Sequence, residues 1–254
     1  MEKRGLLTMM STIFYLASIA QPDSAKVTPE SSELWNPVPR IVTPSSSTVT
    51  DALSTAPSDA IVLFDGKDLS KWKSSLPDGK VQWTVAGGAM TVKPGSKDIE
   101  TIQQFDDYQL HIEFRTPAEV QGTSQGRGNS GIFMQGKYEL QVLDNYNNRT
   151  YSNGQAGAIY KQTMPLVNAC RKPGEWQTYD VIYTSPKFNK DGMITHPAYI
   201  TVLQNGVLVQ NHTPIYGTTP YRGKPIYEVH GKGPIKLQDH DNTTSFRNIW
   251  IREL

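Results

Sequence analysis

Short runs in which apolar and polar residues alternate dominate the chain from residue 60 onward. In one run, YQLHIEF, the apolar residues Leu110, Ile112 and Phe114 share one face. A period of two predicts half-buried β-strands, and there is almost no helical periodicity. Asn205-Gly206 is a turn pair that predicts a hairpin between its flanking runs. The expected strands cover residues 61–64, 83–85, 89–92, 108–114, 131–135, 138–143, 158–161, 177–183, 198–204, 207–210, 235–240 and 246–251.

About a dozen strands within roughly 195 residues are typical of a sandwich of jelly-roll size. The pattern therefore predicts an all-β fold, a jelly-roll β-sandwich of two antiparallel sheets.

The N-terminal segment has the layout of an export signal. Lys3 and Arg4 precede a mostly apolar stretch at residues 6–20, and Ser18 and Ala20 form a small-x-small cleavage site. The stretch is too short and too polar to predict a membrane-spanning helix. We interpret residues 1–20 as a signal peptide and expect a periplasmic or secreted protein. The alternative is an N-terminal helix that is only partly apolar.

Residues 21–59 form a Pro/Ser/Thr-rich extension, a composition typical of linkers and extended tails. Within it, residues 34–42 (LWNPVPRIV) combine a Trp with apolar residues and prolines. This patch predicts an extended strap that packs on the folded domain, which we expect to span residues 60–254.

Composition excludes several classes of protein. The 254 residues include 25 Lys and Arg against 24 Asp and Glu, so a net charge of +1 provides no electrostatic basis for binding nucleic acid. The single Cys170 excludes an intramolecular disulfide and a Cys-based zinc site.

Polar residues on three predicted strands share a distinctive chemistry. In residues 138–143, Glu139 and Gln141 alternate with apolar residues and should lie on the outer face about 7 Å apart. Gln238 and His240 should point outward from residues 235–240, and Phe133 and Gln135 from residues 131–135. Amides and carboxylates beside aromatic faces are typical of carbohydrate sites. The alternative is that any wet sheet face carries such residues.

The same strand lacks the paired carboxylates of classical sandwich-fold glucanases, which follow a Glu-x-Asp-x-Glu pattern with the two groups about 5 Å apart. Gln141 occupies the central position, and Glu139 and Asp144 should fall on opposite faces of a regular strand. This disfavours an ordinary retaining glycosidase. His230 and His240 are too loosely spaced to define a metal site, although a divalent cation held by His, Glu and Asp stays an alternative.

Seven motifs, in the same order, resemble the 3-keto-disaccharide hydrolase domain family. They are DAIVLFDGKDLSKW (59–72), NSGIF (129–133), GKYELQVLD (136–144), GQAGAIYK (154–161), GEWQTYD (174–180), PIKLQDH (234–240) and FRNIWIR (246–252). The resemblance implies a concanavalin A-like jelly roll and exported enzymes that cleave glycosides whose C3 hydroxyl has become a ketone. Cleavage in such enzymes proceeds by hydrolysis or by 1,2-elimination.

This chemistry needs no carboxylate pair, because a C3 ketone acidifies the C2–H bond and one base can remove that proton. We expect Glu139 or His240 to be the base, and Lys161 or a bound cation to stabilise the enolate. The residues assigned to substrate binding are Asn129, Gln135, Gln141, Asp144, Gln238 and His230. An upstream sugar oxidoreductase is a candidate partner. The rival hypothesis is a non-catalytic carbohydrate-binding module or lectin on the same fold.

Overall fold

The computed structural model describes residues 28–41 and 56–254. The signal peptide predicted at residues 1–20 lies outside the described residues. So do residue 42 of the predicted strap and most of the extension around it. None of the helices in the described part of the chain is long and apolar enough to cross a membrane.

The described residues form seventeen strands and three short 3₁₀ helices. The strands are β1 (Arg40–Ile41), β2 (Ile61–Phe64), β3 (Trp72–Ser74), β4 (Thr84–Ala86), β5 (Ala89–Thr91), β6 (Ile99–Thr101), β7 (Tyr108–Arg115), β8 (Ser130–Met134), β9 (Tyr138–Val142), β10 (Val167–Asn168), β11 (Gln177–Thr184), β12 (Lys187–Phe188), β13 (Ile194–His196), β14 (Ala198–Gln204), β15 (Val207–Ile215), β16 (Lys236–Leu237) and β17 (Ser245–Glu253). The helices are η2 (Pro29–Ser32), η3 (Ser124–Gly126) and η4 (Ser152–Gly154).

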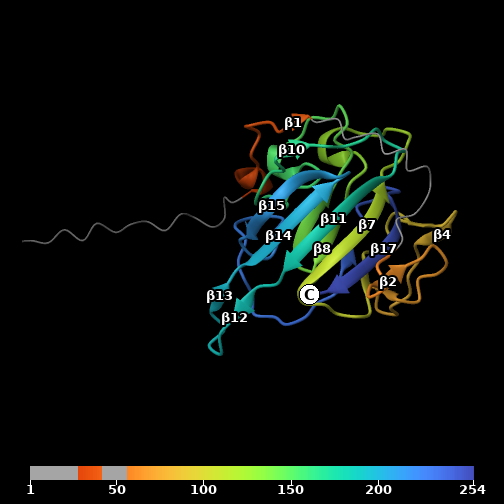
Figure 1. Cartoon of the computed structure of the whole chain (residues 1–254). Helices are drawn as coiled ribbons and strands as arrows, with labels where there is room; N and C mark the ends of the chain where they lie inside the picture. Colours follow the sequence, from red (N-terminus) through yellow and green to blue (C-terminus); the bar gives the residue numbers. More distant parts are fainter. Residues whose placement is uncertain (1–27, 42–55) are drawn as a thin grey trace, which may run out of the picture.

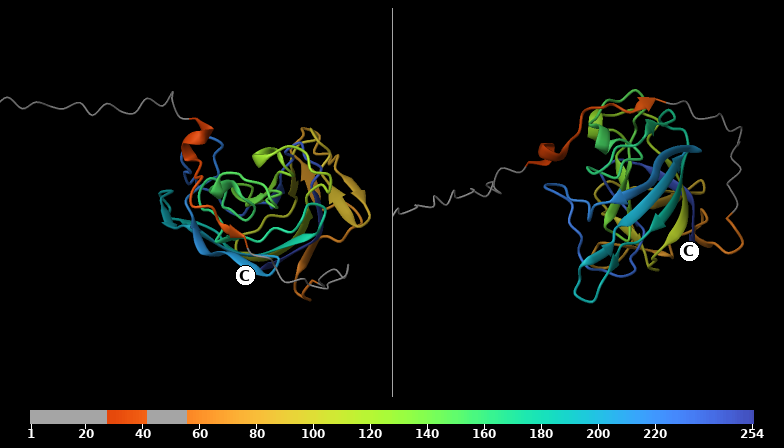
Figure 2. Two further views of the ribbon diagram at one scale, coloured as in Figure 1. Left: turned by 90° about the horizontal axis from the view of Figure 1, so that it is seen from above. Right: turned by 60° about the vertical axis from the view of Figure 1, so that its left-hand side comes forward.

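Two antiparallel sheets form the body of the molecule. The larger has eight strands in the order β15-β14-β11-β7-β17-β5-β4, with β2 also paired to β17 (Figure 1). The smaller has five strands in the order β3-β6-β16-β8-β9. Figure 2 shows the larger sheet as a curved layer with the rest of the domain on its concave side. The predicted all-β jelly-roll sandwich is confirmed.

The core lies between these sheets and follows the predicted alternation. Leu110, Ile112 and Phe114 of β7 are fully buried, as are Leu140 and Val142 of β9. All five belong to one contiguous apolar cluster. Burial of such side chains contributes roughly 1.5–3 kcal/mol each, so the period-two pattern is the main source of the sandwich's stability.

Two predicted strands differ from those observed. Residues 158–161 run beside the free edge of β9 but form only single bridges, at Leu140–Ile159 and Ile159–Thr163. The predicted strand 235–240 is reduced to β16, because regular pairing is limited to Lys236 and Leu237.

The segment 28–41 lies against the domain beside η4 (Figure 2). Asn153 is buried, and its side chain accepts from Leu34 N at 3.0 Å and donates to Ser32 O at 2.9 Å. Ser152 Oγ donates to Pro37 O at 2.6 Å. Strand β1 pairs in parallel with β10. Buried polar side chains of the domain are therefore satisfied by the backbone of this segment.

A charged cluster covers part of the outer face of the larger sheet. His111 Nδ1 lies 2.6 Å from Asp180 Oδ1 and Nε2 lies 3.7 Å from Glu113 Oε1, while the Trp250 ring stacks on the imidazole. Burial opposes the imidazolium, but the two carboxylates prevail and raise the pKa of His111 to about 9. Arg247 Nε binds Glu113 at 2.6 Å and completes a paired, largely buried network.

Candidate active site

A cavity of about 180 Å³ opens on the outer face of the smaller sheet. Its lining combines amide, carboxyl, hydroxyl, imidazole and aromatic groups. The lining residues are Asn129, Phe133, Glu139, Gln141, Tyr160, Thr219, Tyr221, Gln238 and His240. Five of the residues predicted for the site, Asn129, Glu139, Gln141, Gln238 and His240, are thus brought together.

Strand register explains why these side chains meet. Phe133 of β8 pairs with Glu139 of β9 on one side and with Lys236 of β16 on the other. Paired residues point to the same face of a sheet, so these three side chains form a row on the outer face. In the next row, Gly131 pairs with Gln141. The carbonyl oxygen of Gly131 accepts a hydrogen bond from Gln238 N at 3.0 Å.

Glu139 is the chemically distinctive member of the site. Its side chain is largely buried, with the whole residue 6% exposed. Burial, aided by the Asp98 carboxylate, raises the pKa of Glu139 to about 8 against the opposing charge of Lys236. A carboxyl group with this pKa is about nine-tenths protonated at pH 7 and can donate a proton.

Gly131 leaves the space that the Glu139 side chain occupies. A Cβ at this position would lie 2.6 Å from Glu139 Oε1 and 2.9 Å from Phe133 Cε2. Any larger residue would therefore displace the carboxyl group or the aromatic ring that line the cavity.

The Gln141 amide contacts the carboxyl group and connects it to neighbouring amide side chains. One end of the Gln141 amide lies 3.1 Å from Glu139 Oε1, and the other end lies 3.0 Å from Gln125 Oε1. Asn129 Nδ2 donates to Gln125 O at 2.7 Å. Gln238 Oε1 is buried, and within the described residues it has no hydrogen-bond partner. An acceptor of this kind is suited to a ligand hydroxyl.

Two further segments of the chain line the cavity along the free edge of β9. Tyr160 N donates to Glu139 O at 3.1 Å, and the Tyr160 hydroxyl lies 2.6 Å from that of Tyr151. Burial raises the pKa of Tyr160 to about 12, so its hydroxyl keeps its proton at neutral pH. Thr219 Oγ1 accepts from Glu139 N at 3.0 Å and brings the exposed Tyr221 to the cavity mouth.

The ammonium group of Lys161, which is predicted to stabilise the enolate, lies beside the cavity, 5.7 Å from the centre of the Tyr160 ring and 5.2 Å from that of the Tyr221 ring. Lys161 Nζ donates to Pro29 O at 2.9 Å and to Tyr221 O at 3.1 Å, and the residue is absent from the cavity lining. Its backbone has a φ of 57°, which turns the side chain out of line with a regular strand. Lys161 therefore connects the N-terminal segment to the loop that carries Tyr221.

Three other predicted residues lie outside this cavity. Gln135 follows the end of β8 with a φ of 50°, so the alternation breaks and its side chain enters the interior, where Tyr183 Oη donates to Gln135 Oε1 at 2.8 Å. His230 Nε2 lies 2.6 Å from Tyr138 Oη at another part of the sandwich. Asp144 pairs with Arg127 Nε at 2.6 Å and lines a different cavity.

Sequence reasoning missed Tyr160, Thr219 and Tyr221. Tyr160 lies inside the motif at residues 154–161, directly before Lys161, and this position was the available signal. Thr219 and Tyr221 belong to a loop about 80 residues beyond Glu139 in the chain, and no local pattern marks them.

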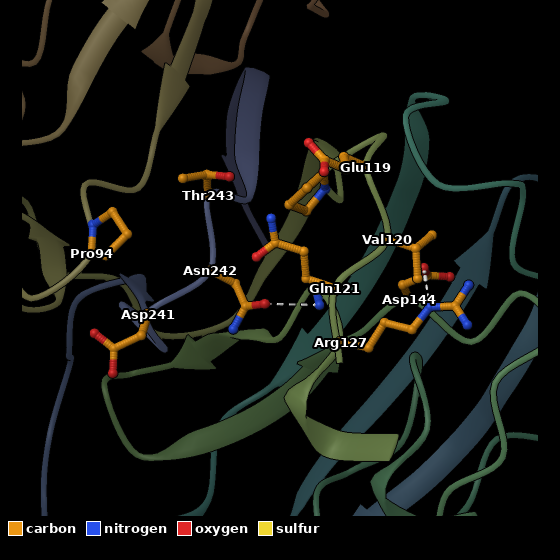
Figure 3. Close-up of a pocket in the computed structure, with 11 residues that line it drawn as sticks. Pro94, Glu119, Val120, Gln121, Arg127, Asp144, Asp241, Asn242 and Thr243 are labelled. Carbon is orange, nitrogen blue, oxygen red and sulfur yellow. Dashed lines mark hydrogen bonds and ion pairs between the residues drawn. The ribbon is translucent and has the colours of Figure 1, made fainter. Parts of the chain in front are cut away.

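A second cavity, of about 290 Å³, is lined by residues of several loops (Figure 3). Figure 3 shows Arg127 and Asp144 paired on one side of it and Asp241 on the other. Asn242 Oδ1 accepts from Gly128 N at 2.9 Å and ties two of the bordering loops together.

Within residues 28–41 and 56–254, no group of three His, Cys, Asp or Glu side chains is arranged to hold a metal ion.

The fold and the amide-rich, aromatic-lined cavity define a carbohydrate-active jelly-roll protein. Residues 59–252 match the model of the 3-keto-alpha-glucoside-1,2-lyase-like domain, also called the 3-keto-disaccharide hydrolase domain, and the chain belongs to this family. The resemblance inferred from the seven motifs is confirmed.

Solved structures agree with this assignment. The chain is 54% identical to a candidate glycosyl hydrolase from Parabacteroides distasonis ATCC 8503, over 92% of this chain and 100% of that one, with a TM-score of 0.77. A second candidate glycosyl hydrolase from the same organism shares the fold at 22% identity over 77% of this chain and 94% of that one, with a TM-score of 0.56. No curated protein matches the chain.

Proposed function

We propose that the protein is an exported enzyme that cleaves the glycosidic bond of 3-keto-glycosides, including 3-keto-disaccharides. The observation that carries this proposal is the buried, protonated Glu139 carboxyl group in a cavity lined by amides and aromatic rings. The matched family and the candidate glycosyl hydrolases support a carbohydrate substrate. Because the substrate is already oxidised, a sugar oxidoreductase must act before this enzyme.

The reaction begins with removal of the C2 proton, for which His240 is the base in this proposal. The C2–H electrons form an enolate with the C3 ketone, and its oxygen is stabilised by hydrogen bonds from the amide-rich wall. The enolate then collapses, the C1–O bond breaks, and a C1=C2 double bond forms as the ketone is restored. Protonated Glu139 donates its proton to the departing oxygen. The products of this elimination are an enone and an alcohol.

Addition of water across the C1=C2 bond would convert the enone to the free 3-keto sugar and give net hydrolysis. The atoms balance in both cases: elimination releases the alcohol without consuming water, and hydrolysis consumes one water molecule. Deuterium at C2 of the free keto sugar formed in D₂O would identify a pathway through the enolate.

A chromogenic 3-keto-glucoside and its unoxidised parent test the proposal directly. We expect release of the chromophore from the keto substrate alone, and the assay is repeated with chelator to measure any metal requirement. Release from the parent glycoside at an equal rate would refute the 3-keto specificity. Binding of sugars without release from either substrate would instead support a lectin.

A further inference from the structure

The two cavities adjoin along three segments of the chain. Gly128 lines the larger cavity and Asn129 the smaller, and His240 and Asp241 are divided in the same way. Gln141 and Asp144, on the third segment, are separated by about 10 Å of extended chain. This separation is about the length of a disaccharide.

One loop, residues 117–127, lines the larger cavity and contacts residues that line the smaller one. Its Gln121 lines the larger cavity (Figure 3). Its Gln125 contacts two residues that line the smaller cavity: Gln125 O accepts from Asn129 Nδ2, and Gln125 Oε1 lies 3.0 Å from the Gln141 amide. The same loop therefore borders the larger cavity and holds part of the lining of the smaller one in place.

The lining of the larger cavity suits a neutral sugar. Glu119 and Gln121 offer a carboxylate and an amide to hydroxyl groups, while Pro94 and Val120 provide apolar surface for C–H groups. Arg127 offsets the charge of Asp144.

Two carboxylates of this cavity leave it with negative charge. Across the described ranges, Glu119 and Asp241 form no ion pair. An anionic ligand would therefore be repelled, and a neutral sugar is favoured over a sugar acid.

We propose that this larger cavity is the leaving-group subsite, which binds a neutral second sugar while the cavity around Glu139 holds the 3-keto sugar. The inference rests on the proposed function and deepens it, because it assigns neutral 3-keto-disaccharides as the preferred substrates. The loop at residues 117–127 then determines selectivity for the leaving group.

The test compares two substrates in the full-length enzyme. One is a 3-keto-glucosyl disaccharide with a neutral hexose as leaving group, and the other is methyl 3-keto-glucoside, which fits the smaller cavity alone. The double variant Glu119→Ala/Gln121→Ala removes two exposed side chains of the loop. We expect kcat/KM for the disaccharide to fall about tenfold, the effect of losing one good hydrogen bond, and kcat/KM for the methyl glycoside to stay within about twofold.

The control variant is Gln104→Ala, an exposed amide that lines neither cavity. It should leave both substrates unaffected. Equal losses on both substrates in the double variant, or no loss on either, would overturn the subsite.

If the wild-type enzyme cleaves neither keto substrate, the proposed function fails and the subsite is tested by binding. Titration calorimetry of the unoxidised disaccharide then decides: about tenfold weaker binding to the double variant supports the subsite, and equal affinity overturns it. A disaccharide with a uronic acid in the leaving position tests the role of charge. We expect the wild type to cleave it with a lower kcat/KM than the neutral disaccharide. The variant Glu119→Gln/Asp241→Asn should recover part of that difference.

Discussion

Replacing Glu139 with Gln should change how the stability of the protein depends on pH. Glutamine has nearly the same shape and is neutral, as the Glu139 carboxyl is at pH 7 with its pKa of about 8. Because the folded-state pKa lies above the ordinary value of 4.5, the folded protein holds this proton more tightly than the unfolded chain. The resulting stabilisation is complete below about pH 4.5 and is lost as the pH rises to about 8.

The magnitude follows from the size of the shift. One proton changes the free energy of unfolding by about 1.4 kcal/mol per pH unit, so the wild type should lose at most about 5 kcal/mol over this window. Glu139→Gln lacks this titration. The variant should therefore become more stable than the wild type as the pH rises, by several kcal/mol near pH 8.

Urea unfolding of both proteins at intervals between about pH 5 and pH 8 measures this difference. Titration of His111 affects both proteins equally and cancels in the comparison. Glu100→Gln is the control, since Glu100 lies on the same outer face but is only half-buried and pairs with Lys73 at 3.1 Å. Parallel pH profiles for the wild type and Glu139→Gln would show that the carboxyl is not held in its neutral form.

The same variant tests the catalytic role of Glu139. Loss of a general acid should lower kcat by about 10²–10⁴. The wild-type rate should fall above pH 8 as the acid loses its proton. A rate that instead rises through pH 8 would make Glu139 the base and exclude the acid role.

Three further predictions follow from other contacts. Gly131→Ala should lower kcat and cost about 1–3 kcal/mol of stability, because the new Cβ meets Glu139 Oε1 at 2.6 Å; an unchanged kcat in a folded variant would contradict the geometry. Lys161→Met should raise KM several-fold with little effect on kcat, since Lys161 connects Pro29 O and Tyr221 O; a hundred-fold loss of kcat with unchanged KM would instead support its predicted catalytic role. His111→Gln should remove up to about 3 kcal/mol of stability that the wild type has below pH 6.5 and loses as the pH rises through about 9; chemical unfolding at both ends of this window measures it, and equal losses at both ends would refute the raised pKa.

Local alternation was sufficient to predict the sandwich and the centre of the candidate site. Glu139 and Gln141 lie two positions apart on one strand, and side chains two apart share a face wherever the strand ends up. The same rule placed Gln238 and His240 on the outer side of their segment. The family followed from motifs in order, which is also a property of sequence alone.

Alternation was not sufficient where a strand ended. At Gln135 the backbone turns to a positive φ directly after β8, so a residue predicted to face outward enters the interior. Lys161 has a positive φ as well, and its partners, Pro29 and Tyr221, are 132 and 60 residues away in the chain. The residue at which a strand ends depends on where the adjacent strand stops offering backbone partners, and this is set by tertiary contacts.

Burial of the outer face was the other feature that only the tertiary structure decided. The sequence placed Glu139 on a polar face, where an ordinary carboxylate pKa would be expected. Tyr160 and Thr219 come from distant segments and close over the edge of β9, so the carboxyl group loses its water and its pKa rises. Desolvation depends on everything that surrounds a group, whereas the direction of a strand side chain depends only on its own backbone.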